Sequence, residues 1–406
     1  MAATTKWSDD RFLDDLRAHS DARSDACVAQ LGDASTYMAL FRTMDANGGA
    51  LPTDAPAPLA DFFAASQGIP RAETDAQRFP DGVDHERMAR GKEVFLTRAT
   101  VACLVLLAKA LPEGYAAPCL SQILSLSGDL KHHPFRRLLG VLEMVVTVMT
   151  PGAFAPDGQA VIIARQIRLM HSGIRRFASE RWAGYATYTA RYGLPVNLED
   201  MLGTIMGFSY LVITGLQTLD ASVTAAHAED YYYVWRVYAQ LMGIHPPDNR
   251  DSSEWVPASV AEAGEFYASY VRRHYTDAAH NPEGVQLARE NLDMLEYLIP
   301  KDLRHLGLQE APRYYMTELI GPEGCARVGL APVRGYPITK WGLEFALHAW
   351  VAFWNLVDDV PLGRDVHDAI SRAFLRHVIV KGDGGTITFL IPDDLKSIRE
   401  LATKGG

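Results

Sequence analysis

The stretch RLMHSGIRR, residues 168–176, places one histidine between arginines inside a long run of helical character. A helix turns by about 100° per residue, so Arg168, His171 and Arg175 fall within roughly 60° of one another and share one face. Burying cations is costly unless an anion meets them, and the same helix offers no acidic partner before Glu180. The pattern therefore predicts that an anion from outside the helix meets this face.

Two interpretations of this face are open on the residues alone. In the first, the histidine binds a haem iron axially and the arginines pair with the haem propionates. In the second, the imidazole is an ordinary core side chain and acidic residues of a neighbouring helix meet the arginines. The sequence has no zinc-protease, di-iron, nucleophile-elbow, Walker A or dinucleotide-binding motif that would favour another centre.

Two other groups of residues have ordinary interpretations. Glu344 and His348 stand four residues apart, which is typical of a polar pair on one helix. The adjacent His132 and His133 precede an expected helix start and are interpreted as a solvated turn.

Outward from this stretch, apolar residues recur at spacings of three and four, which predicts an all-α fold. Asn197 is expected to cap the helix after GLPVN, and Pro134 is expected in a first helical turn. VIVKGDGGTITFLI, near the end of the chain, predicts a small β-hairpin, and residues 300–337 are rich in loop-forming residues. The expected helices are 8–31, 34–46, 57–66, 84–111, 114–129, 134–150, 158–192, 197–219, 227–243, 257–276, 282–299, 338–357 and 363–377.

Composition limits the class of protein. The 406 residues are 48% hydrophobic, enough for a large core, and the net charge of -10 without a basic block disfavours nucleic acid as a partner. The acidic N-terminus lacks the apolar core of a signal peptide, which predicts a cytoplasmic location. Four widely spaced cysteines form no metal-binding or disulfide pattern, so free thiols are expected at Cys27, Cys103, Cys119 and Cys325.

The apolar run 201–219 reaches the length of a membrane span. It also contains glycines, threonines and a glutamine, and acidic residues flank it on both sides. These features favour a buried core helix, and no membrane span is expected.

Taken together, four motifs resemble the rubber oxygenases (latex clearing proteins) and the wider MpaB-type oxygenase family. RQIRLMHSGIRR at 165–176 and GLPVNLEDMLGTIMGFS at 193–209 are similar to the most characteristic segments of the family. Two more segments are similar to helices of the family. The helix before the histidine helix is matched by PFRRLLGVLEMVVTVMTPG at 134–152, and the family's tyrosine-and-tryptophan helix is matched by YYYVWRVYAQLMGI at 231–244. The order and spacing of the four make the resemblance specific, and it covers about residues 7–335.

The resemblance implies a mostly helical, globin-like core that holds one b-type haem and uses dioxygen on alkenes of isoprenoid-type substrates. His171 is then the iron ligand, and Arg168 and Arg175 help to retain the haem. Arg137 and Val141 border the distal cavity as catalytic candidates. The remaining candidates are pocket walls on the helix after Asn197, namely Thr204, taken as catalytic, and Phe208, taken as cofactor-binding.

The sequence departs from the family at several positions, among them the histidines of the family's later helix, which are replaced around Tyr232 to Gln240. The family has a lysine and a threonine three and four residues after the arginine matched by Arg137, where this chain has Gly140 and Val141. The lysine that can occupy the sixth iron position in the family is therefore missing, which predicts a distal side open to small molecules. The family's acidic base, sixteen residues before that arginine, is Ser121 here, so its alkene-cleavage mechanism does not carry over unchanged.

The predicted function is a haem b-dependent oxygenase that oxidises or cleaves an alkene or electron-rich bond of a small apolar molecule, terpenoid or polyketide-like, with dioxygen or peroxide. A haem-binding gas or redox sensor is an alternative with the same proximal residues. A helical interaction protein without cofactor is a third. The expected organisation is N-terminal helices at 1–60, a haem-binding domain at 61–336 and a C-terminal extension of helices and a hairpin at 337–406.

Overall fold

The computed structural model describes residues 5–46, 48–66, 83–126, 134–156, 158–247, 253–298 and 310–331. All regular secondary structure in these ranges is helical, which confirms the mostly helical fold class. The predicted hairpin, the helices expected after 337, His132, His133, Glu344 and His348 lie outside the described residues.

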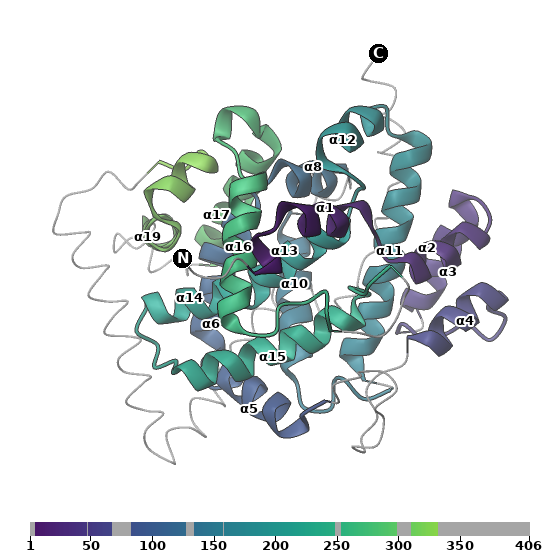
Figure 1. The fold of residues 1–406 in the computed structure, drawn as a ribbon, viewed down its shortest axis with the longest axis horizontal. Helices are drawn as coiled ribbons and strands as arrows, with labels where there is room; N and C mark the ends of the chain where they lie inside the picture. The colour runs from purple at the N-terminus through teal and green to yellow at the C-terminus, as the bar shows by residue number, and fades with distance from the viewer. Residues whose placement is uncertain are drawn as a thin grey trace.

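The helices surround α13, which lies near the centre of the molecule and contacts α1, α7, α14, α15 and α16 (Figure 1). The long α11 runs beside this centre, and α2, α3 and α4 cover its outer side. The bounds are α1 Asp10–Ala18, α2 Ala22–Gln30, α3 Ala34–Ala46, α4 Ala57–Ala65, α5 His85–Leu96, α6 Ala99–Val105, α7 Leu111–Gly114, α8 Pro118–Leu126, α10 Pro134–Met149, α11 Gln159–Arg181, α12 Tyr185–Tyr192, α13 Leu198–Phe208, α14 Tyr210–Thr218, α15 Ala225–Leu241, α16 Val260–His274, α17 Pro282–Leu298 and α19 Ala311–Arg327, with short 3₁₀ turns at Lys6–Ser8 and Ala278–His280 and a π-helix at Leu106–Ala110.

Three of the long predicted helices were wrong because each is interrupted. The helix expected at 8–31 breaks before Asp21, whose carboxylate accepts a hydrogen bond from the Ser24 amide and so caps α2. The helix expected at 158–192 breaks between α11 and α12, and the one at 197–219 breaks at Ser209, where φ is -109° and ψ is -81°. Periodicity continues through such breaks, so the pattern alone did not show them.

Two further predictions were wrong. The helix expected at 84–111 is divided into α5 and a segment bent by 80° from it, and the latter includes the π-helix Leu106–Ala110. The region expected to be loop-rich contains α19, which begins with a proline in its first turn and bends at Gly321, where φ is 70°. Proline in a first turn and a glycine at a positive φ are compatible with a helix that kinks.

The cap predicted at Asn197 and the helix start predicted at Pro134 are both confirmed. The Asn197 side chain accepts a hydrogen bond of 2.9 Å from the Asp200 amide, and α10 begins at Pro134. The four cysteines are buried and free, also as predicted.

The hydrophobic core has two main parts. The larger one joins the central helices, while the smaller one holds the N-terminal helices against α11 through Leu169. Positions 169 and 171 point in nearly opposite directions on a helix, so His171 faces away from this smaller cluster. The buried members of the smaller cluster are Cys27, Val28, Leu31, Tyr37, Phe41, Met44, Leu59, Phe62, Phe63 and Leu169.

One helical stretch, Leu198–Thr218, is long and apolar enough to cross a membrane, and the bent pair His85–Leu96 and Ala99–Gly114 passes the same test when joined. In Leu198–Thr218, 67% of the apolar window is buried within the protein. The stretch packs as a pair of core helices, in agreement with the interpretation of the run 201–219.

Candidate functional site

His171 lies in the middle of α11 with no hydrogen-bond partner for its buried Nδ1 atom. The residue as a whole nevertheless retains an intermediate exposed fraction. Burial, together with the nearby Arg175 charge, lowers the pKa of His171 to about 3. The imidazole is therefore neutral at pH 7 and has a lone pair available for a ligand.

Two arginines on either side of His171 are ion-paired with α2. Arg168 donates from Nε and Nη2 to the two carboxylate oxygens of Asp21, at 2.6 and 2.9 Å. Arg175 donates from Nε and Nη2 to Oδ1 of Asp25, at 2.9 and 2.7 Å. The anions that this face of α11 requires thus come from this chain's own second helix.

The remaining guanidinium nitrogens are also engaged. Nη1 of Arg168 donates to the Leu241 carbonyl at 3.2 Å, and Nη1 of Arg175 donates to the Val196 carbonyl at 3.0 Å. These contacts are the ones expected from the second interpretation, in which acidic residues of a neighbouring helix meet the arginines. Direct pairing of either arginine with a haem propionate stays a prediction.

Space is open beside α13. Thr204 is exposed, although Met201, Leu202 and Ile205 of the same helix are buried. A Cβ added at Gly207, one turn further on, would meet no atom within 4 Å. The Thr204 hydroxyl donates to the Asp200 carbonyl at 2.9 Å and keeps acceptor capacity on this open side.

Phe208 is buried and stacks on Trp235 of α15, with ring centroids 5.2 Å apart and planes 22° apart. Its ring is thus part of the packing between α13 and α15. Its predicted contact with a cofactor stays a prediction.

Space is also open on α10. A Cβ added at Gly140 would have nothing within 4 Å, and the next residue, Val141, is only partly buried. Arg137 falls in the first turn of α10, but its side chain lies outside the described part of the structure. Position 140 therefore has room for a Cβ atom on this side of α10.

The tyrosines of α15 mainly hold the helix in place. The Tyr231 hydroxyl donates to the Phe208 carbonyl at 2.7 Å, Tyr232 donates to the Pro257 carbonyl at 2.9 Å, and Tyr233 accepts from the Asp84 amide at 2.9 Å. The hydroxyl of Tyr238 is buried without a partner. Packing is thus the observed role of three of these four tyrosines.

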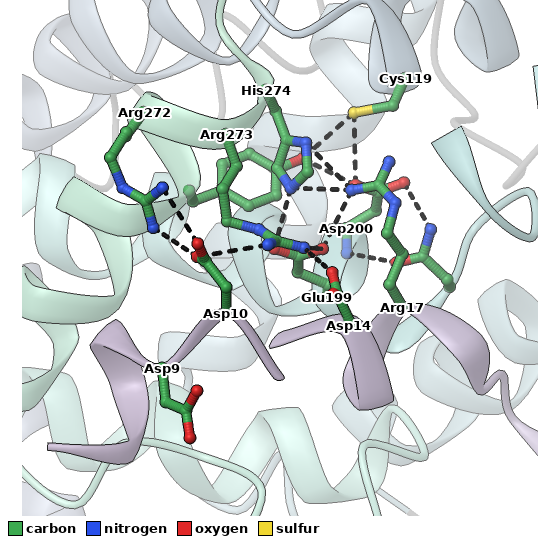
Figure 2. Close-up of polar contacts among 12 residues, drawn as sticks. Asp9, Asp10, Asp14, Arg17, Cys119, Glu199, Asp200, Arg272, Arg273 and His274 are labelled. Carbon is green, nitrogen blue, oxygen red and sulfur yellow. Dashed lines mark hydrogen bonds and ion pairs between the residues drawn. The ribbon is translucent and has the colours of Figure 1, made fainter. Parts of the chain in front are cut away.

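Sequence reasoning missed a buried polar network at the start of α13, shown in Figure 2. Glu199 accepts from Arg17 at 3.0 Å and from Arg273 at 2.9 Å, and it contacts His274 at 2.8 Å. Although burial opposes it, contact with His274 and Arg273 holds the pKa of Glu199 below its ordinary value. Two adjacent acids at the start of an apolar helix were the available signal.

Asp200 occupies the inner part of this network. It accepts hydrogen bonds from the Tyr270 hydroxyl and the Asn197 amide, both at 2.9 Å, and from the Cys119 thiol at 3.3 Å. Burial raises the pKa of Asp200 despite the nearby Arg17 charge. The Asn-x-Glu-Asp run therefore fixes α13 to α1, α8 and α16.

No free carboxylate is found in the described residues at or near the position of the family's acidic base, where the nearest acids in the sequence are Glu113 and Asp129. Ser121, which takes the place of the family's acid, is buried and donates to Asn281 at 2.6 Å. Glu113 accepts from Lys109 and, at 2.8 Å, from Tyr267. Asp129 lies outside the described residues.

Among the described residues, no group of three or more His, Cys, Asp or Glu side chains could hold a metal ion. A haem iron requires only one axial protein ligand, because the porphyrin supplies the equatorial ones. A neutral histidine whose Nδ1 has no protein partner fits that requirement, so His171 is suitable as a haem ligand.

Comparison with known proteins identifies the fold and the family. Residues 92–354 match the family described as ER-bound oxygenase mpaB/B'/Rubber oxygenase, catalytic domain. The chain belongs to this family of oxygenases. It is 24% identical over 367 residues to the rubber oxygenase of Streptomyces sp. (strain K30), and the match covers 83% of each chain.

The same oxygenase fold is found in a solved structure of latex clearing protein LCP in the closed state. The TM-score is 0.67 at 18% sequence identity, with 89% of this chain and 91% of that chain covered. The family match begins at Lys92, so Asp21 and Asp25 lie in a segment before the matched catalytic domain.

Proposed function

We propose that this family member is a haem b-dependent oxygenase with His171 as the proximal iron ligand. The observation that carries this proposal is the neutral imidazole at the centre of α11, whose buried Nδ1 lacks a protein partner. When bound, a haem would supply the iron chemistry by which dioxygen or a peroxide reacts with an organic substrate.

In this proposal, the protein's own residues would line both faces of a haem bound in a globin-like core. His171 holds one side with a neutral ligand, which donates less electron density than a thiolate. On the other side, Gly140 leaves room for a small molecule where the family has a lysine, and Val141 lowers the polarity. Arg137, Thr204 and Phe208 complete the proposed pocket, in which Thr204 offers a hydroxyl.

We propose a small apolar substrate with an alkene or another electron-rich bond, of terpenoid or polyketide-like class. The name of the Streptomyces relative, rubber oxygenase, supports an apolar, unsaturated substrate. The mostly apolar surroundings of α13 and α15 agree with that chemistry, since binding sites for apolar molecules carry few polar groups.

A second candidate function is a haem-based gas or redox sensor. Two observations favour it: Ser121 has no carboxylate, and the Glu113 carboxylate is already engaged by Lys109 and Tyr267. Turnover separates the two: an oxygenase consumes dioxygen in proportion to oxidised alkene, whereas a sensor binds carbon monoxide or dioxygen without product.

The test begins with the absorption spectrum of the purified protein, as isolated and after dithionite and carbon monoxide, and with a pyridine haemochrome assay. We expect a Soret band that carbon monoxide shifts and about one b-type haem per chain. His171→Ala should lose stable haem. The matched control is His280→Ala, since His280 is an exposed histidine paired with Asp277. A His171→Ala protein with normal haem content and an unchanged ligand spectrum would refute the assignment.

A further inference from the structure

The segment from Arg17 to Asp25 connects α11 to the start of α13. At one end, Arg17 pairs with Glu199 and the His19 carbonyl accepts from the Leu198 amide at 2.9 Å. At the other end, Asp21 and Asp25 bind the arginines of α11. One short stretch thus joins the helix of His171 to the helix of Thr204.

Between the two ion pairs, Ser24 of α2 and Ser172 of α11 continue the polar contact between these helices. The Ser24 hydroxyl donates to the Arg168 carbonyl at 2.8 Å, and the Ser172 hydroxyl donates to Ser24 at 2.7 Å. Arg175 also donates to the Ser172 hydroxyl at 2.8 Å. Positions 168, 172 and 175 form one stripe of α11, and position 171 lies about 60° to its side.

The ion pair between Asp21 and Arg168 has no room to rearrange. Asp21 and Arg168 are both 3% exposed. A Cβ added at Gly243, which has a φ of 84°, would lie 2.7 Å from the Asp21 carboxylate and 3.0 Å from Nε of Arg168. The backbone of residue 243 therefore closes over the pair and fixes both side chains.

We propose that Asp21 and Asp25 are positioning residues that set the orientation and depth of His171 by clamping α11 from outside the matched catalytic domain. This inference rests on the proposed haem function. Its basis is the two ion pairs one turn to either side of the ligand, with the serine contact between them. Residues that orient a metal ligand typically change metal affinity by about 10- to 100-fold when they are removed.

The decisive variant is Asp21→Asn, which keeps the shape of the side chain and removes its charge. Two quantities are measured on the full-length haem-loaded protein: the rate of haem transfer to excess apomyoglobin, and the iron–histidine stretching frequency of the reduced haem by resonance Raman. We expect haem loss to be faster by about 10- to 100-fold and the frequency to shift. A change in general stability alone would leave the frequency unchanged.

The matched control is Asp14→Asn, which breaks an exposed ion pair between α1 and Arg273. It should leave both measurements at their wild-type values.

If Asp21→Asn does not fold, Asp25→Asn is measured instead. It removes the charge at the more exposed ion pair and should shift both quantities in the same direction by a smaller amount. A folded Asp21 or Asp25 variant with wild-type frequency and haem loss overturns the clamp. A wild-type protein that binds no haem overturns the proposed function and this role with it.

Discussion

Arg168 and Asp21 meet through two parallel hydrogen bonds in a position where neither side chain is appreciably exposed. Burial alone would raise the pKa of Asp21, but the Arg168 guanidinium holds it below its ordinary value. Arg168→Met should therefore leave an unpaired buried carboxylate and lower the free energy of unfolding by about 3–5 kcal/mol. Urea unfolding of the haem-free protein measures this loss.

The double variant Arg168→Met with Asp21→Asn provides the control. Because it removes both charges, it should be more stable than Arg168→Met alone by at least about 1 kcal/mol. Strictly additive losses would show that the two side chains do not interact energetically.

Gly140→Lys should restore the long side chain that the family has at this position. Nothing lies within 4 Å of a Cβ added at this position, so the first carbon of the new side chain meets no neighbour. We expect the lysine to occupy the sixth iron position, which would give a six-coordinate spectrum and slow the binding of carbon monoxide. The control is Gly114→Lys, at another glycine with open surroundings. An unchanged spectrum in Gly140→Lys would mean that this position lies away from the iron.

Two glycines of α13 should respond in opposite ways to alanine. Gly207 faces open space, so Gly207→Ala should stabilise the protein by up to about 1 kcal/mol through helix propensity. A Cβ at Gly203 would lie 2.7 Å from the ring of Tyr270, which is fixed by its hydrogen bond to Asp200. Gly203→Ala should therefore destabilise it by about 1–3 kcal/mol. Thermal unfolding measures both, and destabilisation by Gly207→Ala would mean that the space beside α13 is filled.

Lys92 should make the free energy of unfolding depend on pH in the alkaline range. Burial lowers its pKa to about 8 from the ordinary 10.5, while its ammonium group donates to the Thr150 carbonyl at 2.8 Å. Between these two values the unfolded chain binds more protons than the folded one, so wild-type stability rises with pH relative to Lys92→Met. From pH 7 to pH 9.5 the difference should change by about 2 kcal/mol in favour of the wild type.

Denaturant unfolding of both proteins at several pH values measures this difference. Groups common to both proteins, such as the buried tyrosines, cancel in the comparison. A difference that stays constant from pH 7 to pH 9.5 would show that Lys92 titrates normally in the folded protein.

The sequence predicted the helical class, the cap at Asn197 and the helix around His171, though not where that helix ends, because these depend on local spacing. It did not predict the break before Asp21, since only the contacts of Asp21 with Ser24 and Arg168 show why the chain turns there. The requirement for an outside anion could be read from RLMHSGIRR, but its source could not. Asp21 and Arg168 are separated by 147 residues, and no local pattern encodes a contact over that distance.

The network around Glu199 and Asp200 was missed for a related reason. The motif was noted as a family likeness and a helix cap, whereas its partners Arg17 and His274 are 257 residues apart in the sequence. Glu199 and Asp200 are of residue types that usually lie on the surface, but here they are buried and held by hydrogen bonds.

The consecutive tyrosines of α15 have a further consequence for the order in which the protein opens. Tyr231, Tyr232 and Tyr233 bond to three different places: the end of α13, the loop before α16 and the residue that caps α5. Local opening of α15 must break all three connections together, so its amide hydrogens should exchange with deuterium only through global unfolding. The helix is thereby expected to form the slowest-exchanging unit of the protein and to outlast the N-terminal helices when the fold loosens.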